Sequence, residues 1–223
     1  MSFAAPRFLD RRRILAGLLL ATQVAAGPRP PARPPVVTVL GDSITAGLGV
    51  PSRAAMPAQL QAALTRMGVG AAVRAAGVSG DTSGGGLARV NHSVARDTAL
   101  CVVALGGNDL LLGIEPRVTK ANLRAILRSL RDRRIGVVLV GVGAPTLFGA
   151  AYAREFNAVY SDLAREFSAP LYPNILAGVV GSRQFMQGDG IHPNAAGARV
   201  IADRLAPLVA QALRTSPALT ATR

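Results

Sequence analysis

The chain has 223 residues, enough for one or two domains, and half of them are hydrophobic, which is enough for a substantial core. The formal net charge is +13, and every basic residue except Lys120 is an arginine. Such a charge would suit a polyanionic partner. However, the arginines are scattered, aromatic residues make up only 4% of the chain, and no nucleic-acid-binding motif is present. Composition therefore argues against a nucleic-acid partner. The use of arginine in place of lysine is more typical of codon bias than of a binding surface.

The first 26 residues have the three parts of a secretory signal peptide. A basic region ends at Arg13, residues 14–26 are apolar but too few to span a bilayer as a helix, and small residues precede the expected cleavage point. The three consecutive arginines 11–13 also resemble a bacterial twin-arginine signal. The alternative is an uncleaved membrane anchor. A lipoprotein is excluded because no cysteine comes directly after the apolar stretch.

This pattern predicts a periplasmic or secreted protein with four segments. We expect a signal peptide over 1–26, a stiff proline-rich linker over 27–35, a folded domain over 36–214 and a flexible tail over 215–223.

Within the folded domain, apolar strand-like segments alternate with segments of helical spacing. The expected strands are 36–40, 71–76, 99–105, 135–142 and 169–173, and the expected helices are 52–67, 84–95, 117–134, 150–167 and 194–213. The only cysteine, Cys101, lies inside the third strand and is expected to be a small core residue rather than a nucleophile. Five such alternations predict an α/β fold with a parallel sheet covered on both faces. Ligands bind such sheets beyond the carboxyl ends of the strands, so the motifs there matter most.

After the first strand the sequence is GDSITAG, residues 41–47. Gly41 and Asp42 form the turn and Ser43 begins a helix, beside backbone N–H groups that lack helical acceptors. Serine and aspartate are also ordinary helix N-caps, so this motif alone leaves a cap and a nucleophile both open.

Glycines and a side-chain amide follow the second and third strands. The stretch GVSGDTSGGG, residues 77–86, lacks the lysine of a phosphate-binding loop and the dinucleotide fingerprint, but Gly80 could offer its N–H to a ligand. The stretch GGNDLLLG, residues 106–113, supplies the amide donors of Asn108 and the carboxylate of Asp109. Asn-Asp is also common turn chemistry, which is the alternative explanation.

Before the last helix the sequence is GDGIHPN, residues 188–194. The spacing of Asp189 and His192 allows the carboxylate to accept from Nδ1–H while Nε2 points outward. A capping aspartate beside a surface histidine is the alternative, and the other histidine, His92, is expected to be an ordinary surface residue. A nucleophile candidate, an Asp/His pair and two kinds of N–H donor at one sheet edge together indicate acyl transfer to a serine.

In this order the motifs resemble the SGNH (GDSL-type) hydrolase family, whose four name residues would be Ser43, Gly80, Asn108 and His192. The blocks GDSITAG, SGDTS, GGND and DGIHP all match, and the similarity runs from about residue 36 to 213. It is strongest to the subgroup of periplasmic acyl-CoA thioesterase I, lysophospholipase and arylesterase. The chain lacks the G-x-S-x-G motif of ordinary α/β-hydrolases.

The resemblance implies a flavodoxin-like three-layer α/β/α sandwich with a five-stranded parallel sheet. It also implies a nucleophile, Ser43, a base, His192, and an orienting acid, Asp189, with an oxyanion hole formed by the N–H groups of Ser43 and Gly80 and the amide of Asn108. No metal and no cofactor are implied. The expected partner is a small-molecule acyl ester or thioester, with transient lipid contact and no obligate protein partner.

Two apolar segments at the same edge are candidates for the acyl-binding groove. They supply Leu110, Leu111 and Ile114 after the third strand, and Pro145, Leu147 and Phe148 after the fourth. Alternatively, both segments only cover the sheet edge. Two functional alternatives also stay open. The first is a carbohydrate or peptidoglycan O-acetyl esterase, and the second is a binding module without activity, against which the presence of all four catalytic residue types argues.

Overall fold

The computed structural model describes residues 1–2 and 34–220. The expected signal peptide and most of the expected linker therefore lie outside the described residues. Between residues 34 and 220, no helix combines the length and the apolar character needed to cross a membrane.

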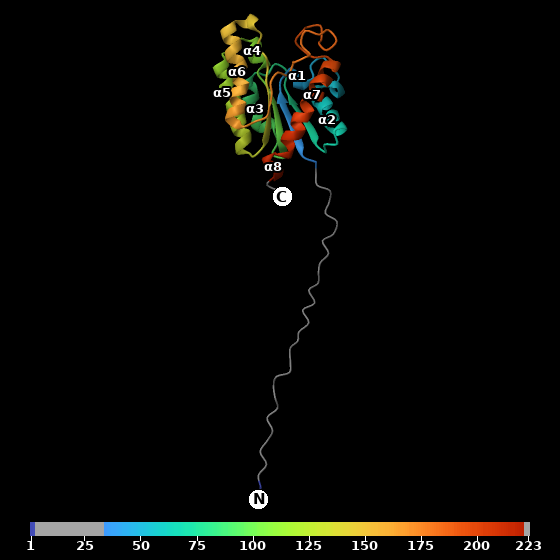
Figure 1. Cartoon of the computed structure of the whole chain (residues 1–223), viewed down its shortest axis with the longest axis vertical. Coiled ribbons are helices and arrows are strands. Elements are labelled where there is room, and N and C mark those ends of the chain that lie inside the picture. Colours follow the sequence, from blue (N-terminus) through green and yellow to red (C-terminus); the bar gives the residue numbers. More distant parts are fainter. Residues whose placement is uncertain (3–33, 221–223) are drawn as a thin grey trace. The chain divides into compact units, whose positions relative to one another are not determined.

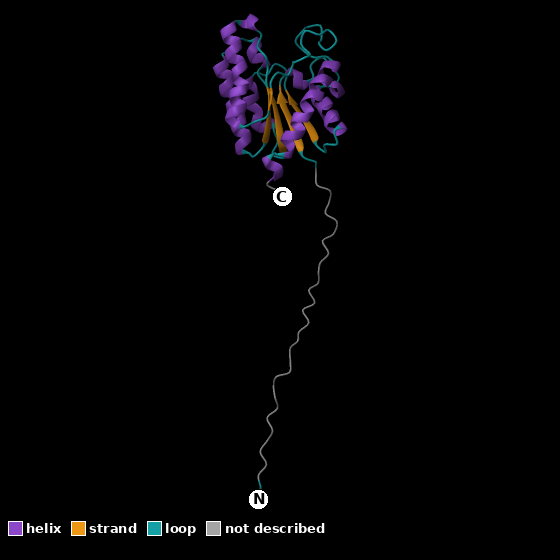
Figure 2. Ribbon diagram, in the orientation of Figure 1, coloured by secondary structure: helices purple, strands orange, loops and turns teal. Residues whose placement is uncertain are grey.

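Five strands form one parallel sheet in the order β2-β1-β3-β4-β5, which confirms the predicted α/β fold and its flavodoxin-like strand order. Figure 2 shows the strands side by side with helices on both faces. The bounds are β1 Val36–Gly41, β2 Ala72–Gly77, β3 Thr98–Ala104, β4 Gly136–Val140 and β5 Leu171–Tyr172.

The central strand β3 is buried along its whole length, because helices cover both of its faces. Cys101 is fully buried there, as predicted, and burial raises the pKa of its thiol to about 12. The edge strand β5 has two residues where the sequence predicted five. Pro170 and Pro173 flank it and carry no N–H to donate to a ladder, which limits the pairing to two residues.

Two groups of helices cover the sheet (Figure 1). α2 Met56–Arg66 and α7 Ala195–Arg214 pack against each other on one face, over a core that includes Leu60, Leu64 and Ile201. The other face is covered by α3 Ser83–Ser93, α5 Pro116–Asp132 and α6 Ala150–Phe167. The predicted apolar stripe of α5 is buried there, through Leu123, Ile126, Leu127 and Leu130.

Several short elements complete the fold: α1 Ser43–Ala46, η1 Ser52–Ala54, α4 Gly107–Leu111, η2 Thr146–Phe148 and α8 Pro217–Thr220. The predicted helix 52–67 is divided into η1 and α2, with Ala55 extended between them. Pro57 lacks an N–H and fits only a first helical turn, so α2 has to begin just before it.

The carboxyl-terminal segment differs from the expected flexible tail. Ser216 is buried and its hydroxyl donates to Ala99 O at 2.5 Å, and α8 follows it. The chain is therefore still packed against β3 one residue beyond the point where the tail was expected to begin.

Candidate active site

Ser43 lies just after the carboxyl end of strand β1, which pairs with β2 and β3, and is the first residue of α1. Asp42 caps this helix by accepting a hydrogen bond from Ile44 N at 3.1 Å. A Cβ at Gly41 would lie 2.7 Å from Ala104 O and closer still to Thr45 Oγ1, so only glycine allows this turn. The strand, the glycine and the cap together fix where the Ser43 hydroxyl lies.

The structure brings Ser43, His192 and Asp189 into one hydrogen-bonded chain, although Ser43 is 149 residues from His192 in the sequence. Ser43 Oγ lies 2.8 Å from His192 Nε2, and His192 Nδ1 lies 2.6 Å from Asp189 Oδ2. When Nδ1 carries the proton and donates it to the carboxylate, Nε2 is free to accept from the serine hydroxyl. This arrangement can move a proton from Ser43 to His192.

Asp189 is suited to stay ionised in this position. The hydrogen bond from the His192 ring, followed by the backbone N–H groups of His192 and Ile191, lowers the pKa of Asp189 to about 2. Those two backbone groups donate to Asp189 Oδ1 at 3.0 and 2.9 Å. The carboxylate is thus held by its own loop, with Oδ2 directed to the imidazole.

The start of α7 holds the loop that carries His192. Gln187 N donates to His192 O at 2.8 Å, and Met186 forms an isolated bridge with Pro193. Asn194 caps α7 by accepting from Ala196 N and Gly197 N, and donates to Gln184 O at 3.0 Å. The backbone of the loop is therefore held on both sides of His192.

Asn108 and Gly80 meet at the same edge of the sheet. Asn108 lies in α4, and its Nδ2 donates one hydrogen to Asp81 O at 2.8 Å. Asparagine carries two amide hydrogens, so the second is available to a ligand. Gly80 precedes Asp81 and has φ +86°, a conformation that favours glycine. The Asn108 contact thus ties the two oxyanion candidates to each other.

Asp109, the second polar residue of the same motif, turns away from this edge. It is fully buried and accepts from Ser83 N at 2.7 Å, from the Ser83 hydroxyl and from Thr119 Oγ1 at 3.0 Å. It therefore fixes the start of α3 against α4 and α5 and plays no direct part at the cavity.

A cavity of about 300 Å³ opens beside Ser43, Asn108 and His192, which all line it. Four of the six predicted acyl-binding residues also line it, namely Leu110, Leu111, Pro145 and Phe148. The remaining apolar wall comes from residues that the sequence did not predict to line a cavity, namely Ile44, Ala104, Val140, Val142, Ile175, Leu176, Val180 and Ile191. The lining of the cavity is therefore largely apolar.

Two predicted lining residues, Ile114 and Leu147, do not line the cavity. The backbone of Ile114 is tied to the base of α4, since its N–H donates to Asp109 O and its carbonyl accepts from Tyr152 Oη. Leu147 lies in η2 with 82% of its surface exposed to solvent. Ile114 lies beyond the end of α4, in the turn that precedes α5. Leu147 is adjacent to Phe148 in the helical turn η2, where neighbouring side chains point in different directions.

Asp42 also lines the cavity, as a second carboxyl group beside Ser43. Burial raises the pKa of Asp42 to about 6, against the opposing effects of the Ile44 N–H and of His192. The protonation of Asp42 therefore changes in a pH range where many esterase assays are performed.

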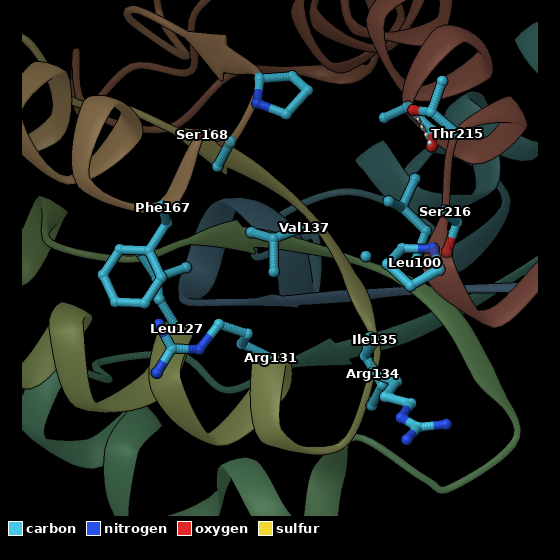
Figure 3. A pocket seen from close by; sticks show the side chains of 15 residues that line it. Leu100, Leu127, Arg131, Arg134, Ile135, Val137, Phe167, Ser168, Thr215 and Ser216 are labelled. Atoms are coloured by element: carbon cyan, nitrogen blue, oxygen red, sulfur yellow. Dashed lines mark hydrogen bonds between the residues drawn. The ribbon is translucent and has the colours of Figure 1, made fainter.

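A second cavity, of about 310 Å³, lies at the opposite ends of the strands, where α5, α6 and α7 end (Figure 3). Figure 3 labels Arg131, Arg134, Ser168, Thr215 and Ser216 among its lining. Arg131 packs over the Phe167 ring, with its guanidinium carbon 5.5 Å from the ring centre. Among the described residues that line this cavity there are hydroxyls but no histidine or acid, so none of them could activate a serine.

The chain is similar to known proteins in both sequence and structure. Residues 39–200 match the model of the GDSL-like Lipase/Acylhydrolase family. The chain is 38% identical to Esterase TesA of Pseudomonas aeruginosa over 187 residues, which is 82% of this chain and 90% of that protein. It is 39% identical to Thioesterase 1/protease 1/lysophospholipase L1 of Escherichia coli over 176 residues, 77% of this chain and 83% of that one.

A solved structure shows the same relationship in three dimensions. The crystal structure of AlinE4, described as an SGNH-hydrolase family esterase, superposes with a TM-score of 0.68 at 39% identity, covering 81% of this chain and 97% of that one. The family match, the identities and the shared fold lead to one conclusion: this chain belongs to the GDSL-like lipase/acylhydrolase family, the SGNH hydrolases, and is an enzyme of the esterase and thioesterase type.

Proposed function

We propose that this protein is an exported serine hydrolase that cleaves esters or thioesters of acyl chains through an acyl-enzyme on Ser43. The observation that carries this proposal is the hydrogen-bonded chain from Ser43 Oγ to His192 Nε2, at 2.8 Å, and on to Asp189. The apolar cavity that Ser43 and His192 line supports an acyl substrate.

The proposed reaction has two steps. Ser43 Oγ attacks the acyl carbonyl while His192 Nε2 takes its proton, and the imidazolium then gives that proton to the departing alcohol or thiol. Water next attacks the acyl-enzyme with His192 again as base, which releases the carboxylic acid and restores Ser43. Asp189, ionised because the pKa of its carboxyl is low, stabilises the imidazolium in both steps.

Three N–H groups are proposed to hold the oxyanion: the backbone N–H groups of Ser43 and Gly80 and the free amide hydrogen of Asn108. As the first residue of α1, Ser43 has an N–H without a helical acceptor. Each preorganised donor of this kind contributes roughly 3 to 4 kcal/mol to the transition state.

The substrate class follows from the cavity. Its walls are mostly aliphatic, with Phe148 as the only aromatic side chain among the described residues that line it. Such a cavity stabilises an alkyl chain by removing it from water, at about 0.8 kcal/mol per methylene. An O-acetyl esterase would not need this volume beyond the carbonyl, and we therefore propose medium to long acyl chains.

Export is proposed from the sequence of residues 1–26, with its basic region, apolar stretch and small residues. Fractionation of cells that express the full-length sequence tests it. Activity in the periplasm or medium, with a shortened amino terminus, is the expected result, and activity retained in the cytoplasm on an intact chain would contradict it.

A series of p-nitrophenyl esters from acetate to laurate tests the substrate class. The protein expressed from the full-length sequence should prefer octanoate or longer chains over acetate in kcat/KM. Preference for acetate would favour the O-acetyl esterase alternative. The matching acyl-CoA series then establishes whether thioesters are hydrolysed as well.

A further inference from the structure

One charged side chain of the stretch GDTSGGGLAR, residues 80–89, plays no part in the proposed mechanism. Arg89 lies in α3, with 18% of its side chain exposed, and it forms an ion pair with Asp81, of which 16% is exposed. Neither residue lines the cavity beside Ser43. A mostly buried guanidinium so close to the site needs an explanation, because burying a charge is costly unless it is well paired.

The guanidinium of Arg89 donates to four acceptors on different segments. Its Nε donates to Asp81 Oδ2 at 2.5 Å, and its Nη2 donates to Gly41 O at 2.8 Å. Its Nη1 donates to Ala76 O at 2.9 Å and to Ser93 Oγ at 3.2 Å. Two of these acceptors are carbonyls at the carboxyl ends of the neighbouring strands β1 and β2, and one is the carboxylate of the loop after β2.

These acceptors connect directly to the three proposed oxyanion donors. Gly41 is two residues before Ser43 in the turn that carries the nucleophile. Asp81 follows Gly80, and its carbonyl accepts the amide hydrogen of Asn108 at 2.8 Å. One guanidinium thus determines how far the Ser43 turn lies from the Gly80 loop and, through Asp81, from the Asn108 side chain.

We propose that Arg89 is a positioning residue, which sets the relative placement of Ser43, Gly80 and Asn108 in the oxyanion hole. The inference rests on the proposed function. An oxyanion hole depends on donors held to within a fraction of an ångström, and a planar guanidinium with a fixed fork of donors can maintain several carbonyls at once. Lysine keeps the charge opposite Asp81 but has a single nitrogen, which cannot replace this fork.

The test compares Arg89→Met and Arg89→Lys with the control Arg74→Met. Arg74 on β2 forms a bidentate ion pair with Asp97 at 2.8 and 3.0 Å, on the surface and away from the cavity. For each variant the fraction of active enzyme is titrated with an alkyl fluorophosphonate, which loses fluoride on reaction with the serine, and kcat and KM for p-nitrophenyl octanoate are measured per titrated site. The melting temperature is recorded in parallel.

Arg89→Met should lower kcat per titrated site by about 10- to 100-fold, with KM changed less than about twofold, because donors are displaced by a fraction of an ångström. Arg89→Lys should recover the melting temperature more fully than kcat. Arg74→Met should leave kcat unchanged. If Arg89→Met does not fold, Asp81→Asn serves instead, since it weakens the ion pair but keeps the carbonyl that holds Asn108, and it should lower kcat in the same way.

A double-mutant cycle distinguishes positioning from general support of the fold. If Arg89 acts through the oxyanion donors, Arg89→Met should cost much less in an Asn108→Ala background than in the wild type. Equal costs in both backgrounds, or losses that follow only the titrated fraction, would overturn the inference. Ser43→Ala is included in the same assay. If it retains wild-type activity, the proposed function fails and this inference falls with it, whereas an inactive Ser43→Ala with a fully active Arg89→Met contradicts this inference alone.

Discussion

The cavity beside Ser43 and the cavity beside Arg131 have nearly the same volume, about 300 and 310 Å³, but they lie at opposite ends of the strands of one sheet. The cavity at the carboxyl ends of the strands is bordered by the starts of α1 and α4, and His192 lies just before the start of α7. The cavity at the amino ends is bordered by the last turns of α5, α6 and α7. The two cavities therefore have the same size. They differ in which ends of the helices border them: amino-terminal ends at the first cavity and carboxyl-terminal ends at the second.

Helix polarity accounts for the residue types at each edge. Helix starts present N–H groups, which suit a developing oxyanion, whereas helix ends present carbonyls and favour cationic side chains. Arg131, Arg165 and Arg214 lie in the last turns of α5, α6 and α7. Arg131 at the second cavity is thus explained by helix stability, without any ligand. We therefore expect catalysis only at the carboxyl ends of the strands, and the following experiments test that expectation.

The largest expected effect comes from exchanging the nucleophile. Ser43→Ala should lower kcat by about 10⁴- to 10⁶-fold, and His192→Ala by a similar factor, because the two act as one unit. Arg131→Ala in the second cavity should remain within about twofold of the wild type, since 65% of its side chain is exposed and it touches no reacting group. Steady-state hydrolysis of p-nitrophenyl octanoate checks all three. A comparable loss in Arg131→Ala would remove the distinction between the edges.

Removing one oxyanion donor should have the next largest effect. Asn108→Ala is expected to lower kcat by about 10²- to 10³-fold with little change in KM, since the donor acts mainly in the transition state. Asn122→Ala is the matched control, because its amide donates to Ser83 Oγ at 3.0 Å outside the cavity. If the two variants have equal kcat values, Asn108 is not a donor to the oxyanion.

Asp42, beside Ser43, should make the free energy of unfolding depend on pH. Its folded pKa of about 6 lies above the unfolded value of 3.8, so its ionisation reduces stability as pH rises from about 4 through 6. Asp42→Asn keeps a good N-cap and removes this penalty, so its free energy of unfolding relative to wild type should rise by up to about 3 kcal/mol between pH 4 and 7. Urea unfolding at several pH values measures it.

Asp97→Asn is the control for the Asp42 variant. Arg74 lowers the pKa of Asp97, so this carboxylate stabilises the fold above pH 3.8 and the contribution disappears as pH falls. Replacing it should therefore produce the opposite pH trend. Parallel curves for the two variants would show that burial of Asp42 does not control the effect.

The smallest predicted effect concerns acyl-chain length. Leu111→Trp should fill part of the apolar cavity and lower the preference for octanoate over acetate by about tenfold, equal to the burial of roughly two methylenes. Leu147 is exposed and does not line the cavity, although it precedes Phe148, which does. Leu147→Trp should therefore keep the wild-type preference for octanoate over acetate. A shift of similar size in both variants would place the acyl group outside this cavity.

The sequence predicted the sheet, the five main helical segments and the residues that meet beside Ser43, because each is determined by local periodicity or by a short motif at a strand end. It did not predict which apolar residues line the cavity. Leu110 and Ile114 are in one short apolar segment, but of the two only Leu110 lines the cavity, since Leu110 lies in α4 and Ile114 lies beyond the end of that helix. Ile175, Leu176 and Val180 come from a loop without periodicity, so nothing local pointed to the cavity.

The role of Arg89 could not be predicted from the sequence for a related reason. Its motif is local, but its acceptors Gly41 and Ala76 lie 48 and 13 residues earlier in the chain. Only the pairing of β1 with β2 brings these two carbonyls close enough for one guanidinium to donate hydrogen bonds to both.

Covalent labelling tests the central claim most directly. The wild-type protein is treated with an alkyl fluorophosphonate, digested and analysed by mass spectrometry, alongside Ser43→Ala and His192→Ala. We predict one adduct on the peptide that contains Ser43, no adduct in Ser43→Ala and strongly slowed labelling in His192→Ala. Labelling at another serine, for example Ser168 or Ser216 at the second cavity, or labelling that Ser43→Ala leaves unchanged, would contradict the assignment of Ser43 as the nucleophile.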